Sequence, residues 1–310
     1  MVFNSTRLPE NWCSFLIASN SKSNSVYYHI TLISCIVISL LAPMAVAGNA
    51  LILAAIWKNP SFRTPFYVLL ANLAFTDFCT GLLSQPSHIV NRLGDLSGNI
   101  KVFCIARVIA QVVGYYFASL TVIVMTIMAV ERWLHMSRRS LLTVRRVIML
   151  YSTSTVLLIA FLGCHMYNWY HTNEYFSAFI VVFVLGAALC FLITVFAYFK
   201  VYRIIRRHQN QVQNYENVID IKKYKKSVFT ILYILVIYLL SYVPFVCCIV
   251  VVSVLDLGSE SWNAAIDACT VIVFSSSFSN PLLYCWRIKE IRHSVRAIFR
   301  KLCCKKYEAE

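Results

Sequence analysis

Seven long runs of apolar residues, separated by short polar segments, dominate the pattern along the 310-residue chain. Each run reaches the about 20 residues that an α-helix needs to cross the hydrocarbon core of a bilayer. The predicted spans are approximately residues 29–57, 65–91, 102–135, 144–165, 176–205, 227–255 and 262–286. Because the connections are too short to fold as separate domains, the sequence predicts an all-α membrane protein, a seven-transmembrane helix bundle over residues 29–287.

The segment after the last span, residues 288–310, is rich in basic residues but keeps apolar residues at helical spacing. These apolar residues are Ile288, Ile291, Val295, Ile298, Phe299 and Leu302. A helix with one apolar stripe and a basic face lies in the plane of a membrane surface. We therefore expect a short amphipathic eighth helix and a tail after the bundle, and a separate N-terminal segment over residues 1–28.

Basic residues are distributed unevenly over the segments between the spans. The chain is 59% hydrophobic and 13% charged, with a net charge of +15 and a mean hydropathy of +0.68. One alternating set of segments holds 23 of the 28 Lys and Arg residues, and the other set holds only Arg7, Lys22, Arg92, Lys101 and Arg107. By the positive-inside rule the richer set is cytoplasmic, so the N-terminus is extracellular and the C-terminus is cytoplasmic. A basic face against anionic membrane lipid accounts for the charge, and no nucleic-acid partner is expected.

Asp77 is the clearest polar residue inside a predicted span. The amides of Asn49 and Asn280 lie at comparable depth, and hydrogen bonds between helices, worth under ~1–2 kcal/mol each, explain amides alone. An ionised Asp in hydrocarbon needs a proton or a cation, and no Lys or Arg lies deep in any predicted span. We therefore predict an allosteric Na⁺ and no other cofactor. Its predicted ligands are Asp77, Asn49, Thr121, Ser277 and Asn280.

Two prolines interrupt the last two spans. Pro244 and Pro281 each remove one backbone hydrogen bond and kink the helix. A static kink is one explanation. Two kinks near a buried acid favour hinges in a bundle that has two conformations.

Short motifs occur in order along the chain, one in each expected span. They are Gly48–Asn49, Asn72–Asp77, Glu131–Trp133, Pro244 and Asn280–Tyr284. In this order the chain resembles the rhodopsin-like (class A) G-protein-coupled receptors over essentially its whole length. The resemblance implies a plasma-membrane receptor, not an enzyme, that passes an extracellular signal to a heterotrimeric G protein and binds arrestin.

The resemblance also assigns roles to residues near the inner ends of the spans. In the resting receptor Glu131 pairs with Arg132, and on activation span six swings outward and Arg132 contacts a Gα subunit. The remaining switch positions are Tyr198, Tyr224, Tyr242, Pro244, Asn280, Pro281 and Tyr284. The alternative is that Glu131 and Arg132 are interfacial charges that extend to the lipid headgroups.

Covalent modification sites are implied at both ends of the chain. Asn4 lies in the sequon "NST" on the predicted outer side. Cys303 and Cys304 follow the amphipathic helix, where palmitoylation would anchor it to membrane lipid.

Several positions depart from the usual family pattern. Cys104 lies about one turn above the usual cysteine of span three, and Cys164 is its candidate partner beside the very short second outer loop, roughly residues 165–175. Cys190 replaces the proline of span five, and Tyr242 replaces the tryptophan before Pro244. These departures are typical of the melanocortin, lysophospholipid, cannabinoid and adenosine branch. Gly114 in place of the amine-binding aspartate, and Phe274 in place of the retinal-binding lysine, exclude amine and retinal ligands.

Arg107 and Gln111 are four residues apart and therefore share one face near the outer end of span three. A guanidinium beside an amide donor binds phosphate or carboxylate well, and aromatic residues below it can hold an apolar tail. The aromatic candidates are Tyr115, Tyr242, Phe245 and Phe274, with Tyr116, Phe117 and Trp262 beside them. An anionic lipid-like ligand is preferred over a small peptide or a nucleoside. Alternatively, Arg107 extends to the headgroups or pairs with Asp95 or Asp267, and the aromatic residues are ordinary packing.

An ion or proton transporter is the alternative function, because it also explains Asp77 and the kinks. The spans form no inverted repeat, however, and no chain of acids crosses the bundle. An intramembrane enzyme needs catalytic groups that converge at one depth, and Asp77 has no acidic or histidine companion deep in a span. A receptor is therefore the function that the sequence favours.

Overall fold

Helices account for nearly all of the residues that the structure describes. The computed structural model describes residues 25–137, 141–172, 176–211, 233, 236–237, 239–251 and 260–304. The elements are α1 (Ser25–Lys58), η2 (Pro60–Phe62), α2 (Pro65–Cys79), η3 (Thr80–Ser84), α3 (Gln85–Leu96), α4 (Ile100–Met136), α5 (Val144–Thr172), α6 (Phe176–Gln211), α8 (Glu260–Arg287) and α9 (Lys289–Cys304). A further helical segment, Leu239–Val251, is the described part of the sixth predicted span.

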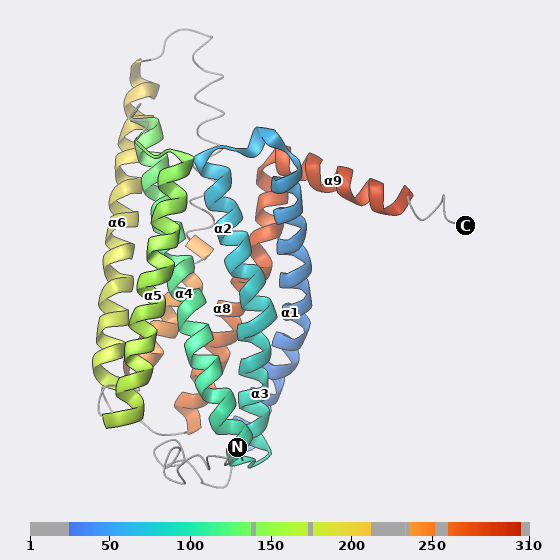
Figure 1. Ribbon diagram of the computed structural model, residues 1–310, viewed down its shortest axis with the longest axis vertical. Coiled ribbons are helices and arrows are strands. Elements are labelled where there is room, and N and C mark those ends of the chain that lie inside the picture. Colours follow the sequence, from blue (N-terminus) through green and yellow to red (C-terminus); the bar gives the residue numbers. More distant parts are fainter. Residues whose placement is uncertain are drawn as a thin grey trace, which may run out of the picture.

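The long helices form one bundle whose two ends differ (Figure 1). Within the described ranges, six helical spans are long and apolar enough to cross a membrane. α1 packs beside α8 and α2, and α4 packs beside α3 and α6. α9 leaves the bundle at the end opposite the start of α1 and runs across the bundle axis (Figure 1). The predicted all-α bundle with a short helix after its last span is confirmed.

Several predicted span boundaries differ from the helices, and two of these differences change the outer end of the bundle. α5 continues beyond residue 165 to Thr172, and the second span continues beyond residue 91 to Leu96. Neither extension contains a proline that would end the helix, and a helix can continue past the hydrocarbon into the headgroup region. The predicted second outer loop is therefore mostly helical.

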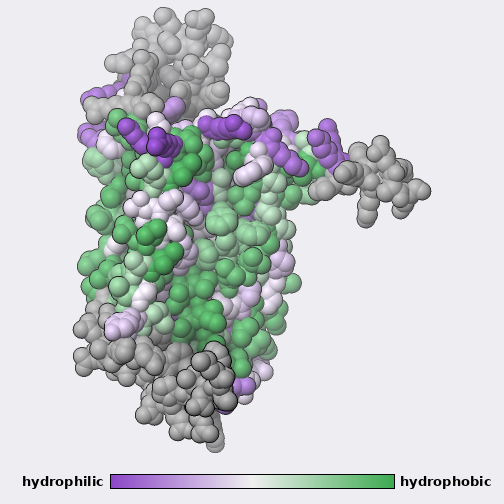
Figure 2. Space-filling view, viewed as in Figure 1, coloured by the Kyte–Doolittle hydropathy of each residue, from purple (hydrophilic) through white to green (hydrophobic). Residues whose placement is uncertain are grey.

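Exposed apolar side chains cover the sides of the bundle (Figure 2). Leu40, Leu157 and Leu185, on three different helices, are 63%, 64% and 64% exposed. Hydrophilic side chains gather instead at the end from which α9 leaves (Figure 2). Such an apolar belt is the surface that hydrocarbon covers in a membrane protein.

The largest apolar core lies at the end of the bundle near α9. Leu69 and Leu73 of α2 and Met128 of α4 are fully buried in it, together with Tyr284 of α8 and Ile291 of α9. Burying a large apolar side chain contributes about 1.5–3 kcal/mol. This core therefore fixes the inner ends of α2, α4 and α8 relative to one another.

The glycine of the first motif allows a close approach between α1 and α8. A Cβ atom on Gly48 would lie 3.1 Å from Cγ of Pro281, which is closer than ordinary van der Waals contact. Gly48 therefore lets α1 pack directly against the proline of α8.

A π-helical turn, η3, interrupts the second span three residues after Asp77. Pro86 follows it near the start of α3. Because proline has no N–H to donate, the wider turn accommodates both the missing hydrogen bond and an extra residue. The turn changes which face of α3 points inward, and Gln85, Asn91 and Arg92 are buried there. Hydrophobic periodicity predicts one regular helix over residues 65–91, and this prediction does not include the π turn. The proline of Gln85–Pro86 is the feature of the sequence that indicates an irregular turn there.

Candidate functional site

A cavity of about 420 Å³ opens between α3, α4, α6, α8 and the segment Leu239–Val251. Its lining includes every residue predicted for the ligand site: Arg107, Gln111, Tyr115, Tyr242, Phe245 and Phe274. His88, Asn91 and Arg92 of α3 also line it, and they were not predicted. Arg107 is therefore not the only basic residue that a ligand would meet in the outer half of the bundle.

The deeper wall of the cavity is mostly apolar. It is formed by Ala118, Val122 and Met125 of α4, and by Phe183, Val184 and Phe191 of α6. The polar side chains Arg92, Arg107 and Gln111 lie toward the outer ends of their helices. The cavity therefore combines a basic outer end with an apolar interior.

Three predicted aromatic residues lie outside this lining. Tyr116 stacks edge-on against Phe117, with ring centroids 5.0 Å apart, and neither lines the cavity. Consecutive residues of a helix point about 100° apart, so the positions after Tyr115 turn away from the cavity. Trp262, near the start of α8, is also absent from the lining.

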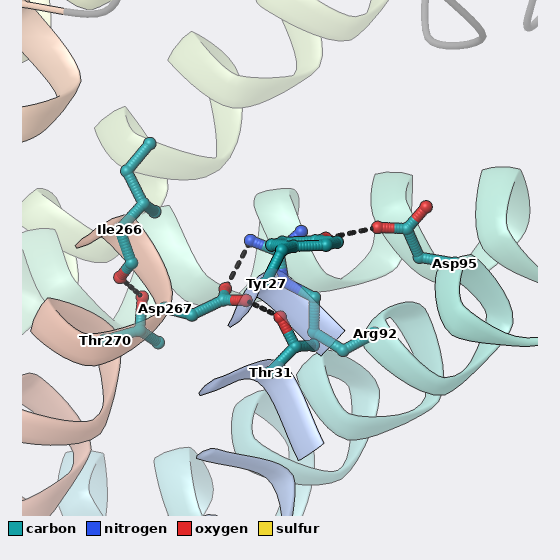
Figure 3. Close-up of polar contacts among 7 residues, drawn as sticks. All are labelled: Tyr27, Thr31, Arg92, Asp95, Ile266, Asp267 and Thr270. Atoms are coloured by element: carbon teal, nitrogen blue, oxygen red, sulfur yellow. Dashed lines mark hydrogen bonds and ion pairs between the residues drawn. The ribbon is translucent and has the colours of Figure 1, made fainter. Parts of the chain in front are cut away.

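A buried ion pair joins α3 to α8 beside the cavity (Figure 3). A guanidinium nitrogen of Arg92 lies 2.5 Å from a carboxylate oxygen of Asp267, and the exposed fractions of the two side chains are 6% and 0%. Thr31 of α1 donates a hydrogen bond of 2.8 Å to the other oxygen of Asp267. Asp267 therefore connects α1, α3 and α8 at one point.

A second acid on α3 is engaged by α1. The hydroxyl of Tyr27 donates a hydrogen bond of 2.6 Å to Asp95 (Figure 3). Asp95 and Asp267, the two acids suggested as alternative partners of Arg107, are thus bonded to Tyr27 and to Arg92.

Arg107 makes no ion pair within the described part of the chain. Its Nε atom is buried and has no hydrogen-bond partner there. Nε2 of His88 is buried without a partner in the same way, and the His88 ring packs edge-on against Phe274 at a centroid distance of 5.7 Å. An unsatisfied buried donor is costly, so the outer end of the cavity offers unused hydrogen-bonding capacity to a ligand.

The buried acid of the second span is hydrogen-bonded to the seventh. Nδ2 of Asn280 donates to a carboxylate oxygen of Asp77 at 2.7 Å, and the side chain of Ser277 lies against the same carboxylate. Asn49 donates to the carbonyl oxygens of Ala45 and Ser277 at 2.9 and 3.0 Å.

The residues around Asp77 fit a small monovalent cation. The Oδ1 atom of Asn49 is buried without a hydrogen-bond partner in the described residues, and Thr121 on α4 is also buried. Carboxylate, amide and hydroxyl oxygens are suitable ligands for a hard cation. Asp77 supplies the single carboxylate among these donors, so the donor set suits a cation of low charge.

At the inner end of the bundle, Arg132 contacts both its neighbour and α2. Its Nε atom lies 3.3 Å from a carboxylate oxygen of Glu131, and their side chains are 11% and 8% exposed. The pair is not aligned as a hydrogen bond. The guanidinium also lies over the ring of Phe66, 3.8 Å from its centroid, a contact that the sequence did not predict.

The other predicted switch residues occupy the α6, α8 and sixth-span helices. The hydroxyls of Tyr198 and Tyr284 are buried without a hydrogen-bond partner among the described residues. Tyr242 and Pro244 lie in Leu239–Val251, and Pro281 lies inside α8. Tyr224 lies outside the described residues. Their roles in switching stay predictions.

The predicted pairing of Cys104 with Cys164 is wrong. Cys104 is disulfide-bonded, whereas Cys164 is a free and exposed thiol. Cys164 lies within α5, which continues to Thr172, so it is a helix residue and not a cysteine of the second outer loop. Asn4 lies outside the described residues, as do the side chains of Cys303 and Cys304 at the end of α9.

Comparison with known proteins identifies the class to which these features belong. The family described as 7 transmembrane receptor (rhodopsin family) matches residues 48–284. The chain therefore belongs to the rhodopsin family of seven-transmembrane receptors, and it is a G-protein-coupled receptor. The resemblance seen in the motifs is confirmed, and no comparison supports the transporter alternative.

Relatives in this family align along most of the chain. The chain is 23% identical to the "Probable G-protein coupled receptor 45" of Homo sapiens, over 89% of this chain and 84% of that protein. It is 21% identical to the "High-affinity lysophosphatidic acid receptor" of Xenopus laevis, over 86% of this chain and 81% of that protein. A shorter match, 38% identical over 64 residues, links 21% of this chain to 18% of the human "Olfactory receptor 1L6".

Proposed function

We propose that this G-protein-coupled receptor is activated by a single-chain lipid with a phosphate or carboxylate headgroup, which binds in the outer cavity. The receptor acts in the plasma membrane, with its N-terminus extracellular and its C-terminus cytoplasmic. Bound ligand shifts the bundle toward the conformation in which Arg132 contacts a Gα subunit, and the active receptor also recruits arrestin.

The charge distribution in the cavity is the observation that carries this proposal. Arg92 is compensated by Asp267 at 2.5 Å, whereas Arg107 makes no ion pair in the described part of the chain. A guanidinium that lines a cavity without an ion-pair partner favours an anion, and its planar array of N–H donors matches phosphate and carboxylate oxygens. The apolar wall along α4 and α6 then suits an acyl chain.

The names of the relatives point in the same direction. The frog protein that aligns over 86% of this chain is named as a receptor for lysophosphatidic acid, which is a single-chain lipid with a phosphate headgroup. At 21% identity the ligand is not transferred by similarity alone. The likeness supports the lipid class that the cavity chemistry favours over a peptide or a nucleoside.

We also propose that Na⁺ binds beside Asp77 as an allosteric inhibitor. The ligands are Asp77, Asn49, Thr121, Ser277 and Asn280. Because Asp77 and Asn280 belong to different helices, a cation between them would favour the packing of the resting bundle.

A lipid panel in cells tests the ligand class. Single-chain lipids are applied to receptor-expressing and mock-transfected cells, and cAMP, calcium and arrestin recruitment are measured. The lipids carry a phosphate, a carboxylate, a choline or an uncharged headgroup. We expect responses to phosphate or carboxylate lipids only, and their loss in the Arg107→Ala variant. Lys101→Ala, which removes an exposed basic residue outside the cavity lining, is the matched control and should respond like the wild type. Activation by the choline or uncharged lipids alone would refute the proposed class.

A further inference from the structure

The contact between Arg132 and Phe66 goes beyond the receptor's assigned function and its ligand. The guanidinium carbon of Arg132 lies 3.8 Å from the centroid of the Phe66 ring. A cation within about 6 Å of a ring centroid is attracted by the negative face of the ring. Only 11% of the Arg132 side chain is exposed, and partial exclusion of water strengthens such a contact.

The local sequence holds the Phe66 ring in place. Phe66 is the second residue of α2, which begins at Pro65 after an extended Thr64. The Phe62 side chain of η2 is buried, and its ring packs 4.3 Å from that of Tyr67. The Tyr67 ring in turn lies 5.2 Å from Phe66. This aromatic group fixes the start of α2 at the inner end of the bundle.

Core packing one turn deeper sets the register between the two helices. Leu69 and Leu70 follow Phe66 by three and four residues, and they are fully buried in the same core as Met128. Met128 precedes Arg132 by four residues, so the two side chains share one face of α4. The packing of α2 on α4 therefore places the Phe66 ring against Arg132 and keeps it there.

The charged contact of Arg132 with Glu131 is a second restraint on the same guanidinium. The two atoms are 3.3 Å apart but are not aligned as a hydrogen bond. We propose that Phe66 is a positioning residue that holds Arg132 in its resting conformation through a cation–π contact. The proposal does not depend on which ligand the receptor binds.

Basal signalling measures this contact without a ligand. Activation requires Arg132 to leave the Phe66 ring, so removing the ring raises the fraction of receptor in the active conformation. Release of Gβγ is measured in separate cell lines, each of which expresses a Gα subunit of a different family. The signal is normalised to the surface expression of the receptor. Phe66→Leu should raise ligand-free signalling by roughly three- to tenfold, and Phe66→Tyr should match the wild type.

A control separates the contact with Arg132 from a general effect of losing an aromatic side chain. Phe199, whose side chain is 49% exposed, makes a similar contact with Arg203 at 4.7 Å. Phe199→Leu should leave ligand-free signalling unchanged. The proposal is overturned if Phe66→Leu signals at or below the wild-type level, or if Phe66→Tyr rises as much as Phe66→Leu.

Fluorinated phenylalanines at position 66 keep the test decisive even if Phe66→Leu does not reach the cell surface. Each added fluorine withdraws electron density from the ring face and changes its shape little. Ligand-free signalling should therefore rise stepwise with one, two and three fluorines. A flat series would show that Phe66 acts only through packing.

Discussion

The guanidinium of Arg92 on α3 and the carboxylate of Asp267 on α8 form a buried ion pair, 2.5 Å apart. Thr31 of α1 completes the shell of Asp267 at 2.8 Å. The pair joins the outer ends of three helices and neutralises one of the two arginines of the cavity. It therefore leaves Arg107 as the basic side chain available to an anionic ligand.

Breaking this pair should destabilise the receptor strongly. Removing one partner of a buried ion pair leaves an uncompensated charge and costs about 3–5 kcal/mol. We expect Asp267→Asn to lower both the thermal unfolding temperature of the purified receptor and its surface expression. Asp95→Asn is the matched control, because an amide oxygen can still accept the hydrogen bond of Tyr27. A larger loss of stability in Asp95→Asn would contradict the importance given to the Arg92–Asp267 pair.

Sodium sensitivity should depend on Asp77. If Na⁺ stabilises the resting bundle, raising NaCl at constant ionic strength, with choline chloride as the replacement salt, should lower ligand-free nucleotide exchange. Asp77→Asn removes the charge that holds the cation while keeping the shape of the side chain, and it should abolish this salt effect. A variant that keeps the full response to sodium would rule out the site.

The two candidate bridge cysteines should differ in their effect on folding. A native disulfide typically contributes about 2–4 kcal/mol, and Cys104 is disulfide-bonded whereas Cys164 is free. Cys104→Ser should therefore reduce surface expression and the unfolding temperature, and Cys164→Ser should change neither. Equal losses in the two variants would contradict this assignment.

An acid introduced at the inner end of the sixth span should restrain basal signalling. Many family members hold the equivalent of Arg132 with an acid at the position of Tyr224, which lies outside the described residues. One added charged contact stabilises the resting state by about 1 kcal/mol, several-fold in population. We expect Tyr224→Glu to lower ligand-free signalling in the wild type and in Phe66→Leu. Because this acid is missing here, we also expect the wild type to signal measurably without ligand. Wild-type signalling equal to that of mock-transfected cells would contradict this expectation.

Much of the fold and part of the site could be predicted because they follow from short-range patterns. Apolar runs of sufficient length define the spans, and the four-residue spacing of Arg107 and Gln111 places both on one face, where they line the cavity. Asp77 and Asn280 were predicted to lie at the same depth in their spans, and their side chains are hydrogen-bonded at 2.7 Å.

Other features depend on tertiary structure that periodicity does not encode. The π turn η3 rotates α3, so Arg92, which lies just past the predicted end of the second span, becomes a buried cavity residue. Phe66 and Arg132 are neighbours only because α2 packs on α4. The free thiol of Cys164 lies within α5, which contains no proline and continues to Thr172.

Nucleotide exchange by the purified receptor in lipid nanodiscs is the decisive test of activation by an anionic single-chain lipid. The receptor is mixed with a heterotrimeric G protein, and GTP analogue uptake is followed with increasing amounts of a single-chain phosphate lipid or its choline counterpart. We expect the phosphate lipid alone to accelerate exchange. The Arg107→Ala substitution should weaken the potency of the phosphate lipid by roughly 30- to 1,000-fold, equivalent to about 2–4 kcal/mol. The Arg132→Ala variant should bind the lipid but should not stimulate nucleotide exchange. Equal potency in the wild type and Arg107→Ala, or normal exchange in Arg132→Ala, would contradict this expectation.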